Sequence, residues 1–454
     1  MKTLVVLTSI GLLGMFSEIF RVRKILLPLV VLGLIAAIGA AVFDWNTNAM
    51  YHNNMMLVDN YSLAFSITMI ATTLLWFSMS SGFFSSENSK SDHFSLIVFA
   101  LTGAVLMTSF NNLLMLFLGI EILSISMYIL AGSNKTNLSS NEAALKYFLM
   151  GSFATGFLLF GVALVYGATG SFHLDQIATA VTLQAGSWML YAGVLMILVA
   201  MAFKVSAVPF HFWAPDVYQG SPTVVTSFMS TVVKTAALAA FFRLFIHTFS
   251  PVSQMWHTTL YVIAAATILV GNITAVYQTN VKRMLAYSSI SHAGYMLIAI
   301  LAMHGSAGNS LLFYAIAYSA SSLASFAVLL IISSSTGNES IESFYGLARK
   351  NPFLAVMVVI SVLSLAGIPP TAGFFAKYYI FVSAMQNGLT PLVIIAITGS
   401  LIGVFYYFRL IIALFRDGDA VQIQLKPAFN VVLITAAVIA LVLGLMPGLV
   451  VELL

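Results

Sequence analysis

The sequence predicts an all-α polytopic membrane protein, and three properties of the chain lead to this fold class. Of the 454 residues, 60% are hydrophobic and only 7% are charged, and the mean hydropathy is +1.01. Apolar blocks of about 20 residues recur along the whole chain, which is the length that a helix needs to cross about 30 Å of hydrocarbon. Most Lys and Arg residues lie in the short segments between these blocks. A soluble globular domain does not have this composition.

The apolar blocks predict about fourteen transmembrane helices. In chain order, we expect them at residues 1–20, 23–43, 58–84, 94–110, 112–131, 142–167, 186–209, 222–247, 257–278, 283–303, 308–333, 352–387, 390–415 and 427–450. The first block lacks the basic start and the small-residue cleavage site of a signal peptide, so we expect it to remain as the first helix.

The charges of the connecting segments predict the orientation of the chain. The basic residues fall in or beside one alternating set of loops: Arg21, Arg23, Lys24, Lys90, Lys135, Lys282, Arg283, Arg349, Lys350, Arg416 and Lys426. The opposite set, such as residues 43–57 and 168–176, contains no Lys or Arg. The positive-inside rule therefore places the basic loops in the cytoplasm, or in the matrix for an organellar chain. Both termini are then expected on the periplasmic side of a cell inner membrane.

Two segments of the chain resemble each other and predict an internal repeat. Residues 147–170 align without a gap to residues 314–337, with shared aromatic, small and Thr-Gly positions. The segments are five spans apart, an odd number, so we expect two units of opposite orientation. A span interrupted by proline follows each segment, at Pro209 and at Pro369–Pro370. Such paired interruptions are typical of the translocation sites of inverted-repeat transporters, although proline also merely kinks many transmembrane helices.

This repeat predicts the domain organisation. Three N-terminal helices come first, then two inverted five-helix repeats, each containing a broken helix, and then one C-terminal helix. The corresponding ranges are residues 1–90, 94–250, 255–416 and 426–454.

Four ionisable residues lie far from the ends of their expected spans. They are Glu121, Lys204, Lys234 and Lys377. A charge in the hydrocarbon region costs about 2.5–3.5 kcal/mol on the insertion scale, so such residues usually face a bundle interior or water and carry a function. Glu121 and Lys204 have a simpler alternative, a structural ion pair. A further interpretation of Lys204 is that its long side chain extends to place the ammonium at the membrane surface.

Lysines of this kind are suited to a proton relay. Burial favours the neutral amine and a nearby carboxylate favours the ammonium, so a change in a neighbouring charge switches a lysine between holding and releasing a proton. His211 and His292 are candidates to bridge between the lysines, because imidazole can both accept and donate a proton. For His211 the alternative is a structural role, in which it bonds to carbonyls freed by the break at Pro209.

Glu142 and Lys146 stand four residues apart at the expected start of a helix. Ser140 or Asn141 is expected to cap this helix, and a Glu-to-Lys pair at this spacing stabilises it by about 0.2–0.5 kcal/mol. The functional alternative is that Glu142 and Lys146 take up protons from the cytoplasm and pass them to Lys204.

The sequence lacks the residues and motifs that several classes of site require. With no cysteine, it has no disulfides and no thiolate ligands for iron–sulfur clusters or haem. The sequence contains no Walker A loop, no dinucleotide-binding glycine motif after a strand, and no zinc-ligand spacing. We therefore expect no cofactor and no metal in this chain. We do not expect nucleic acid as a partner, because the basic residues lie in short loops beside apolar spans. The expected environment is the lipid bilayer.

Five stretches carry a resemblance to a known family. They are FKVSAVPFHFWAPDVYQGSPT (203–223), GIEILSISMYIL (119–130), NEAALKYFLMGS (141–152), NVKRMLAYSSISHAGY (280–295) and LAGIPPTAGFFAKYYIF (365–381). With them the chain resembles the subunit N family, the antiporter-like membrane subunits of NADH-quinone oxidoreductase (respiratory complex I), over nearly its whole length. The stretch HFWAPDVYQG distinguishes this family from subunits L and M and from Mrp antiporter subunits, which carry a form closer to HTWLPDA.

The resemblance implies a role for each buried charge. Glu121 and Lys204 match the family's charge pair, Lys234 its connecting lysine and Lys377 its terminal lysine. Glu142 and Lys146 match family positions without a settled role. The implied function is proton translocation coupled to electron transfer from NADH to quinone.

The resemblance also implies partners. FMN, the iron–sulfur clusters and the quinone are expected in other subunits, and subunits M, A, J and K are the expected neighbours. The alternatives are an Mrp-type Na⁺/H⁺ antiporter subunit built on the same repeats, and a membrane scaffold whose lysines are only paired.

Overall fold

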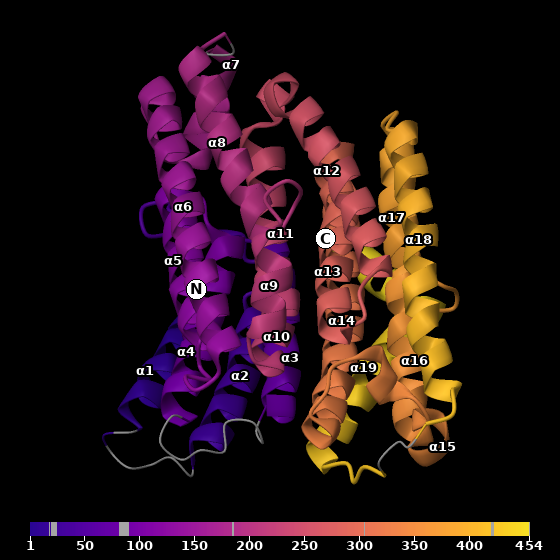
Figure 1. The fold of residues 1–454 in the computed structure, drawn as a ribbon. Helices are drawn as coiled ribbons and strands as arrows, with labels where there is room; N and C mark the ends of the chain where they lie inside the picture. The colour runs from indigo at the N-terminus through magenta and orange to yellow at the C-terminus, as the bar shows by residue number, and fades with distance from the viewer. Residues whose placement is uncertain are drawn as a thin grey trace. The chain divides into compact units, whose positions relative to one another are not determined.

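The computed structural model divides the chain into two compact units (Figure 1). The first unit comprises residues 1–205 and 232–260, and the second comprises residues 206–231 and 261–454. The structure describes residues 1–17, 19, 25–80, 90–183, 186–303, 305–418 and 422–453, with the side chain of Lys90 left out. Arg21, Arg23 and Lys24, and the ends of the expected spans 1–20 and 58–84, lie outside the described residues.

The first unit is a bundle of helices with one β-hairpin. Its elements are α1 (Lys2–Phe16), α2 (Leu26–Phe43), β1 (Ala49–Tyr51), β2 (Met56–Val58), α3 (Asn60–Ser80), α4 (Lys90–Ser109), α5 (Leu113–Ala131), α6 (Leu138–Thr169), α7 (Leu174–Leu183), α8 (Trp188–Lys204), α11 (Lys234–Arg243), the π-helical turn η3 (Leu244–Thr248) and the turn η4 (Ser250–Val252). Within it α5, α6 and α8 run side by side (Figure 1), and α4 packs on α5 and α1.

The second unit is built around two long buried helices. Its elements are α9 (Trp213–Gly220), α10 (Thr223–Phe228), α13 (Val281–Ala302), α14 (Ala307–Thr336), η5 (Ile341–Phe344), α15 (Leu347–Lys350), α16 (Pro352–Ala366), α17 (Ala372–Gln386), α18 (Thr390–Phe415), α19 (Pro427–Leu445) and α20 (Gly448–Val451). Two elements cross the unit boundary: the π-helical turn η2 (Met229–Val233) and α12 (Ser253–Val276). Helices α13 and α14 form the core, and α16, α17 and α19 pack around α14.

The structure confirms the predicted fold class, an all-α polytopic membrane protein. In the part of the chain that is described, eleven helices are long and apolar enough to cross a membrane. Three shorter apolar helices, α1, α8 and α16, add to them. The predicted total of about fourteen spans stays a prediction.

Both proline interruptions break their helices. Helix α8 ends at Lys204, and α9 begins at Trp213 after a cis peptide bond between Val208 and Pro209. Helix α16 ends at Ala366, and α17 begins at Ala372 after a cis bond between Pro369 and Pro370. Each interruption thus separates two helices by a short segment that contains proline.

The two aligned segments also end alike. Helix α6 stops at Gly170, whose φ is +73°, and α14 stops at Gly337, whose φ is +70°. A left-handed glycine that ends a helix needs the freedom that only glycine has at low cost. The shared Thr-Gly of the alignment is thus a shared helix end. The opposite orientation of the two repeats stays a prediction.

The structure corrects the predicted cap of α6 and the expected loops at two further segments. The cap of α6 is Asn137, whose side chain accepts from Ser139 N at 2.9 Å, and not Ser140 or Asn141. Ser140 lies inside the helix and donates to the carbonyl of Ala131 at 2.7 Å. The hairpin β1–β2 and the short helix α7 occupy segments that we expected to be loops.

Candidate functional site

Lys204 and Glu121 each have a hydroxyl partner in the first unit. Lys204 is the last residue of α8 and is 7% exposed. Its ammonium donates to Ser124 Oγ on α5 at 2.5 Å and lies 5.9 Å from the ring centre of Tyr128. Glu121, one turn before Ser124, accepts from Thr155 Oγ1 on α6 at 2.7 Å. Glu121 and the hydroxyl partner of Lys204 therefore lie on neighbouring turns of α5, and each charge is held by a hydroxyl group.

A small cavity adjoins Lys204. Its volume is about 10 Å³, and its lining includes both Lys204 and Thr155 together with apolar side chains of α5, α6 and α8. This is about the space that one water molecule needs. Because Thr155 bonds to Glu121, a water in this cavity would join the hydroxyl partner of the carboxylate to the ammonium.

Lys234 is the first residue of α11 and is 2% exposed. It follows the π-helical turn Met229–Val233 directly. Such turns inside longer helices are frequent at functional sites. Helix α11 packs against α4, α3 and α8 within the first unit, so Lys234 shares this unit with Glu121 and Lys204.

Lys377 lies in the second unit, at the other broken helix. Its ammonium donates to the carbonyl of Ala366 at 2.8 Å and to Ser400 Oγ at 2.7 Å. It also lies 5.0 Å from the ring centre of Tyr295. Ala366 is the last residue of α16, so the lysine of α17 bonds to the free carbonyl end of the preceding half-helix.

The two histidines lie in the second unit and differ in their surroundings. His292 Nδ1 lies 2.8 Å from the Tyr314 hydroxyl, and Nε2 lies 3.2 Å from the Tyr407 hydroxyl. Ser288 continues this row with a short hydrogen bond to Tyr407. His211 is 5% exposed, and its Nδ1 has no hydrogen-bond partner among the described residues.

Glu142 and Lys146 form the expected pair at the surface. Their side chains are 64% and 41% exposed, and the ammonium lies 2.7 Å from the carboxylate. They stand on α6 about two and a half to three and a half turns before Thr155, at 3.6 residues per turn.

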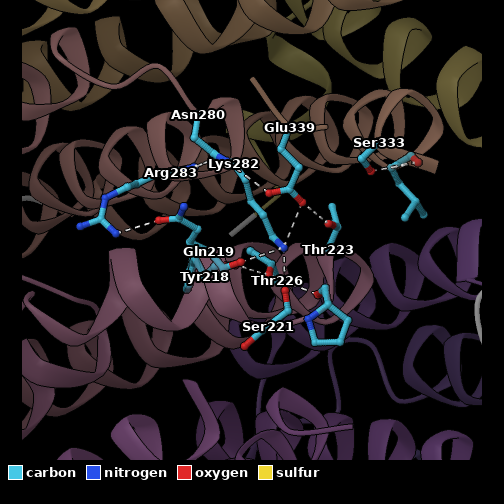
Figure 2. Close-up of polar contacts among 12 residues, drawn as sticks. Tyr218, Gln219, Ser221, Thr223, Thr226, Asn280, Lys282, Arg283, Ser333 and Glu339 are labelled. Carbon is cyan, nitrogen blue, oxygen red and sulfur yellow. Dashed lines mark hydrogen bonds and ion pairs between the residues drawn. The ribbon is translucent and has the colours of Figure 1, made fainter. Parts of the chain in front are cut away.

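The structure adds a polar cluster that sequence reasoning missed (Figure 2). Lys282, which we assigned to a basic loop, is 3% exposed. Its ammonium contacts the Glu339 carboxylate at 3.3 Å and the carbonyl oxygen of Ser221 at 2.6 Å. The sequence offered one signal for this cluster. Lys282 lies in the stretch NVKRMLAYSS, in which two basic residues come before the polar start of an expected helix.

Among the described residues, no group of three or more His, Asp or Glu side chains is arranged to hold a metal ion.

Comparisons with known proteins place the chain among membrane subunits of respiratory complexes. A family model described as "NADH:quinone oxidoreductase/Mrp antiporter, TM" matches residues 110–403. The chain is 43% identical to NADH-quinone oxidoreductase subunit N of Flavobacterium psychrophilum, over all of both chains. It is 44% identical to subunit N of Cytophaga hutchinsonii, over all of this chain and 99% of the relative.

Solved structures give the same result. A chain of respiratory complex I from Thermus thermophilus, with bound aureothin, superimposes with a TM-score of 0.85 at 33% identity, covering 99% of this chain and 98% of that one. A chain of the Mrp complex from Dietzia sp. reaches a TM-score of 0.88 at 20% identity, covering 99% of this chain and 95% of that one. At this identity the second likeness shows the fold alone.

Proposed function

The chain belongs to the subunit N family of NADH-quinone oxidoreductase, and from this premise we propose how it works as a proton-translocating membrane subunit of that complex. Electron transfer from NADH to quinone takes place in other subunits. FMN, the iron–sulfur clusters and the quinone are assigned to those subunits, in line with the lack of cysteine in this chain. The task of this chain is to move protons through its buried charges.

The observation that carries the proposal is the position of the three buried lysines. Lys204 is the last residue of α8 before the first break, and Lys234 follows a π-helical turn. Lys377 bonds to the carbonyl that ends α16 before the second break. Interrupted helices free backbone groups and admit water at membrane depth, and they mark the sites of transporters. Two lysines at broken helices and a third directly after a π-helical turn fit a proton path better than a scaffold.

We order the path from the exposed pair Glu142–Lys146 inward to the buried lysines. Protons are taken up from the cytoplasm, with Glu142 and Lys146 as the outermost groups, and reach Lys204. A change in the charge of Glu121 lowers the tendency of Lys204 to keep its proton. The proton then passes to Lys234 and on to Lys377, with His211 and His292 as bridging groups, and leaves on the periplasmic side.

The assembly and location follow from the family. The partners are other membrane subunits of the complex, with the antiporter-like subunit M and the small subunits A, J and K as the proposed neighbours. We place the chain in the cell inner membrane with both termini on the periplasmic side, because the opposite loops carry the basic residues.

The test compares buried lysines with a surface lysine. Lys204→Ala and Lys234→Ala are introduced into the complete complex, and protons pumped per NADH oxidised are measured in membrane vesicles. Both variants are expected to lower this ratio while the complex assembles with its normal flavin content. The control is Lys426→Ala, because Lys426 is exposed and should leave the ratio unchanged.

Two outcomes count against the proposal. An unchanged ratio in both buried variants excludes this path. Exchange of Na⁺ for H⁺ by the purified chain without NADH oxidation would instead favour the Mrp-type antiporter.

A further inference from the structure

Lys282 is buried, and all of its bonding capacity is used. An ammonium group has three donors, and Lys282 has three acceptors in the second unit (Figure 2). They are the carbonyl of Ser221 at 2.6 Å, the carbonyl of Gln219 at 3.3 Å and Glu339 Oε1 at 3.3 Å. A fully bonded ammonium with 3% exposure is a fixed structural connection and not a solvated surface charge.

Two of these acceptors belong to the end of a half-helix. Helix α9 ends at Gly220, and the carbonyls of its last turn have no partner within the helix. A cation at this end also interacts favourably with the helix dipole. Lys282 therefore closes the C-terminal end of α9, the second half of the first broken helix.

Glu339 connects the same lysine to two further segments. Its carboxylate accepts from Thr223 Oγ1, at the first position of α10, at 3.1 Å. It also accepts from the Asn280 amide at 3.5 Å. The backbone carbonyl of Glu339 accepts from Val281 N at 2.8 Å. The pair Lys282–Glu339 thus joins the end of α9, the start of α10, the start of α13 and the segment after α14.

Arg283 provides a second and weaker connection to α9. Its guanidinium contacts Asp216 Oδ1 and Gln219 Oε1, each at 2.9 Å. The side chains of Arg283 and Asp216 are 29% and 39% exposed, and ion pairs near the surface contribute about 0–1 kcal/mol. In the Lys282–Glu339 pair the side chains are 4% and 23% exposed, so this less exposed pair is the main connection.

The segments held by the pair lead to groups of the proposed proton path. His211 stands two residues before α9, and the helical segment that begins at Thr223 continues through the π-helical turn to Lys234. A shift at the turn between α9 and α10 would move the end of α9 and the start of α10. Fixing this turn fixes the backbone from which both groups extend.

We propose that the Lys282–Glu339 pair is a positioning element for proton translocation, which holds the turn between α9 and α10 in its working place. The proposal rests on the proposed function, because it assigns the turn a role in the proton path. Neither residue is proposed to carry the translocated proton. Breaking the pair frees the turn, and the coupling of electron transfer to pumping then falls.

The first measurement follows the turn itself. The chain has no cysteine, so Ser221→Cys gives this subunit a single thiol. Ser221 is 1% exposed, and its hydroxyl has no hydrogen-bond partner among the described residues, so the substitution is mild. The detergent-solubilised complex is treated with a polyethylene-glycol maleimide, and the shifted band of this subunit gives the labelling rate.

The labelling rate is compared among four second-site variants. Lys282→Gln and Glu339→Gln are expected to raise the rate about tenfold or more. Lys282→Gln removes the contacts to the end of α9, and Glu339→Gln leaves the buried ammonium of Lys282 without its charged partner. Lys282→Arg keeps the charge and is expected to stay near the reference rate. Arg349→Gln is the matched control, because it removes an ion pair of 2.5 Å whose side chains are 73% and 83% exposed. An unchanged rate in Lys282→Gln would overturn the proposal.

A second reporter separates local release from general unfolding. Ser383 on α17 is 3% exposed, and Ser383→Cys should stay slowly labelled when Lys282→Gln is added. Equal acceleration at both cysteines would overturn the positioning role, because the pair would then stabilise the whole unit.

Pumping distinguishes this proposal from the proposed function. Lys282→Gln is expected to lower protons pumped per NADH and Lys282→Arg to restore them. If Lys282→Gln speeds labelling and leaves the ratio normal, while Lys204→Ala lowers the ratio, the positioning role is wrong and the proposed function stands. If Lys204→Ala and Lys234→Ala leave the ratio normal, the proposed function itself fails, whatever the labelling shows.

Discussion

Lys377 donates to the carbonyl of Ala366 at 2.8 Å, and this bond joins the two halves of the second broken helix. The lysine lies on α17, and Ala366 ends α16. Gly367 follows Ala366 with a φ of +82°, a left-handed conformation that favours glycine. The contact therefore depends on the backbone at the break as much as on the lysine.

Gly367→Ala should disturb this contact. A Cβ at this position would lie 2.8 Å from Lys377 Cδ and 3.1 Å from Nζ, so the lysine has to move. The left-handed backbone adds about 1–2 kcal/mol of strain for any residue other than glycine. We expect protons pumped per NADH to fall. Gly388→Ala is the matched control, because its φ is +75° and nothing lies within 4 Å of the added Cβ. Equal losses in both variants would show that backbone strain alone is responsible.

Tyr407→Phe should weaken the contacts of His292. The Tyr407 hydroxyl lies 3.2 Å from His292 Nε2 and also bonds to Ser288. Its loss removes hydrogen bonds of about 0.5–1.5 kcal/mol each and leaves the ring in place. We expect a lower pumping rate at unchanged flavin content, measured as acidification in inverted vesicles. Tyr378→Phe serves as control, because Tyr378 is 49% exposed. A normal rate in Tyr407→Phe would remove Tyr407 from the proposed path.

The sequence alone was enough to predict the charged residues and the helix breaks inside the expected spans. Lys204, Lys234 and Lys377 interrupt apolar blocks, and prolines interrupt two of the spans, so both kinds of residue are visible without a structure. The hydroxyl groups that bond to these lysines could not be predicted in the same way. Ser124 lies three residues after Glu121, on the same face of a helix, but no local rule pairs it with Lys204, eighty residues further on.

Lys282 shows why part of the site was missed. The positive-inside rule already explains a basic residue beside a span, so Lys282 gave no reason to expect burial. Two of its acceptors are backbone carbonyls at the end of α9, and backbone carbonyls are the same in every sequence. The packing of α13 against α9 buries Lys282 and leaves its neighbour Arg283 partly exposed.

Asp59→Asn should destabilise the first unit. Arg243 is 6% exposed and its guanidinium contacts Asp59 Oδ1 at 2.5 Å, while Asp59 is 26% exposed. Removing one partner of a buried ion pair costs about 3–5 kcal/mol, and the partial exposure of Asp59 reduces this to about 1–3 kcal/mol. We expect a lower Tm of the solubilised complex. Asp417→Asn removes an ion pair of equal length at the surface and should leave the Tm unchanged. Similar values for both variants would contradict this account of burial.

Thr155→Val tests whether Glu121 acts on Lys204 through its hydroxyl partner. Valine has the shape of threonine without the hydroxyl that donates to Glu121 at 2.7 Å. A hydrogen bond to a charged group contributes about 1.5–3 kcal/mol, so the carboxylate should change its position or its protonation. The same substitution also makes the cavity beside Lys204 less polar. We therefore expect protons pumped per NADH to fall in vesicles that contain normal amounts of the complex.

The control for this prediction lies on the same helix. Thr169 Oγ1 donates to the carbonyl of Val165, one turn earlier in α6, at 2.7 Å. Thr169→Val removes a hydrogen bond of the same length, but its acceptor is an uncharged carbonyl. Pumping should therefore stay normal. If Thr155→Val also pumps normally, Glu121 does not need its hydroxyl partner, and any influence on Lys204 has to act directly between the two charges.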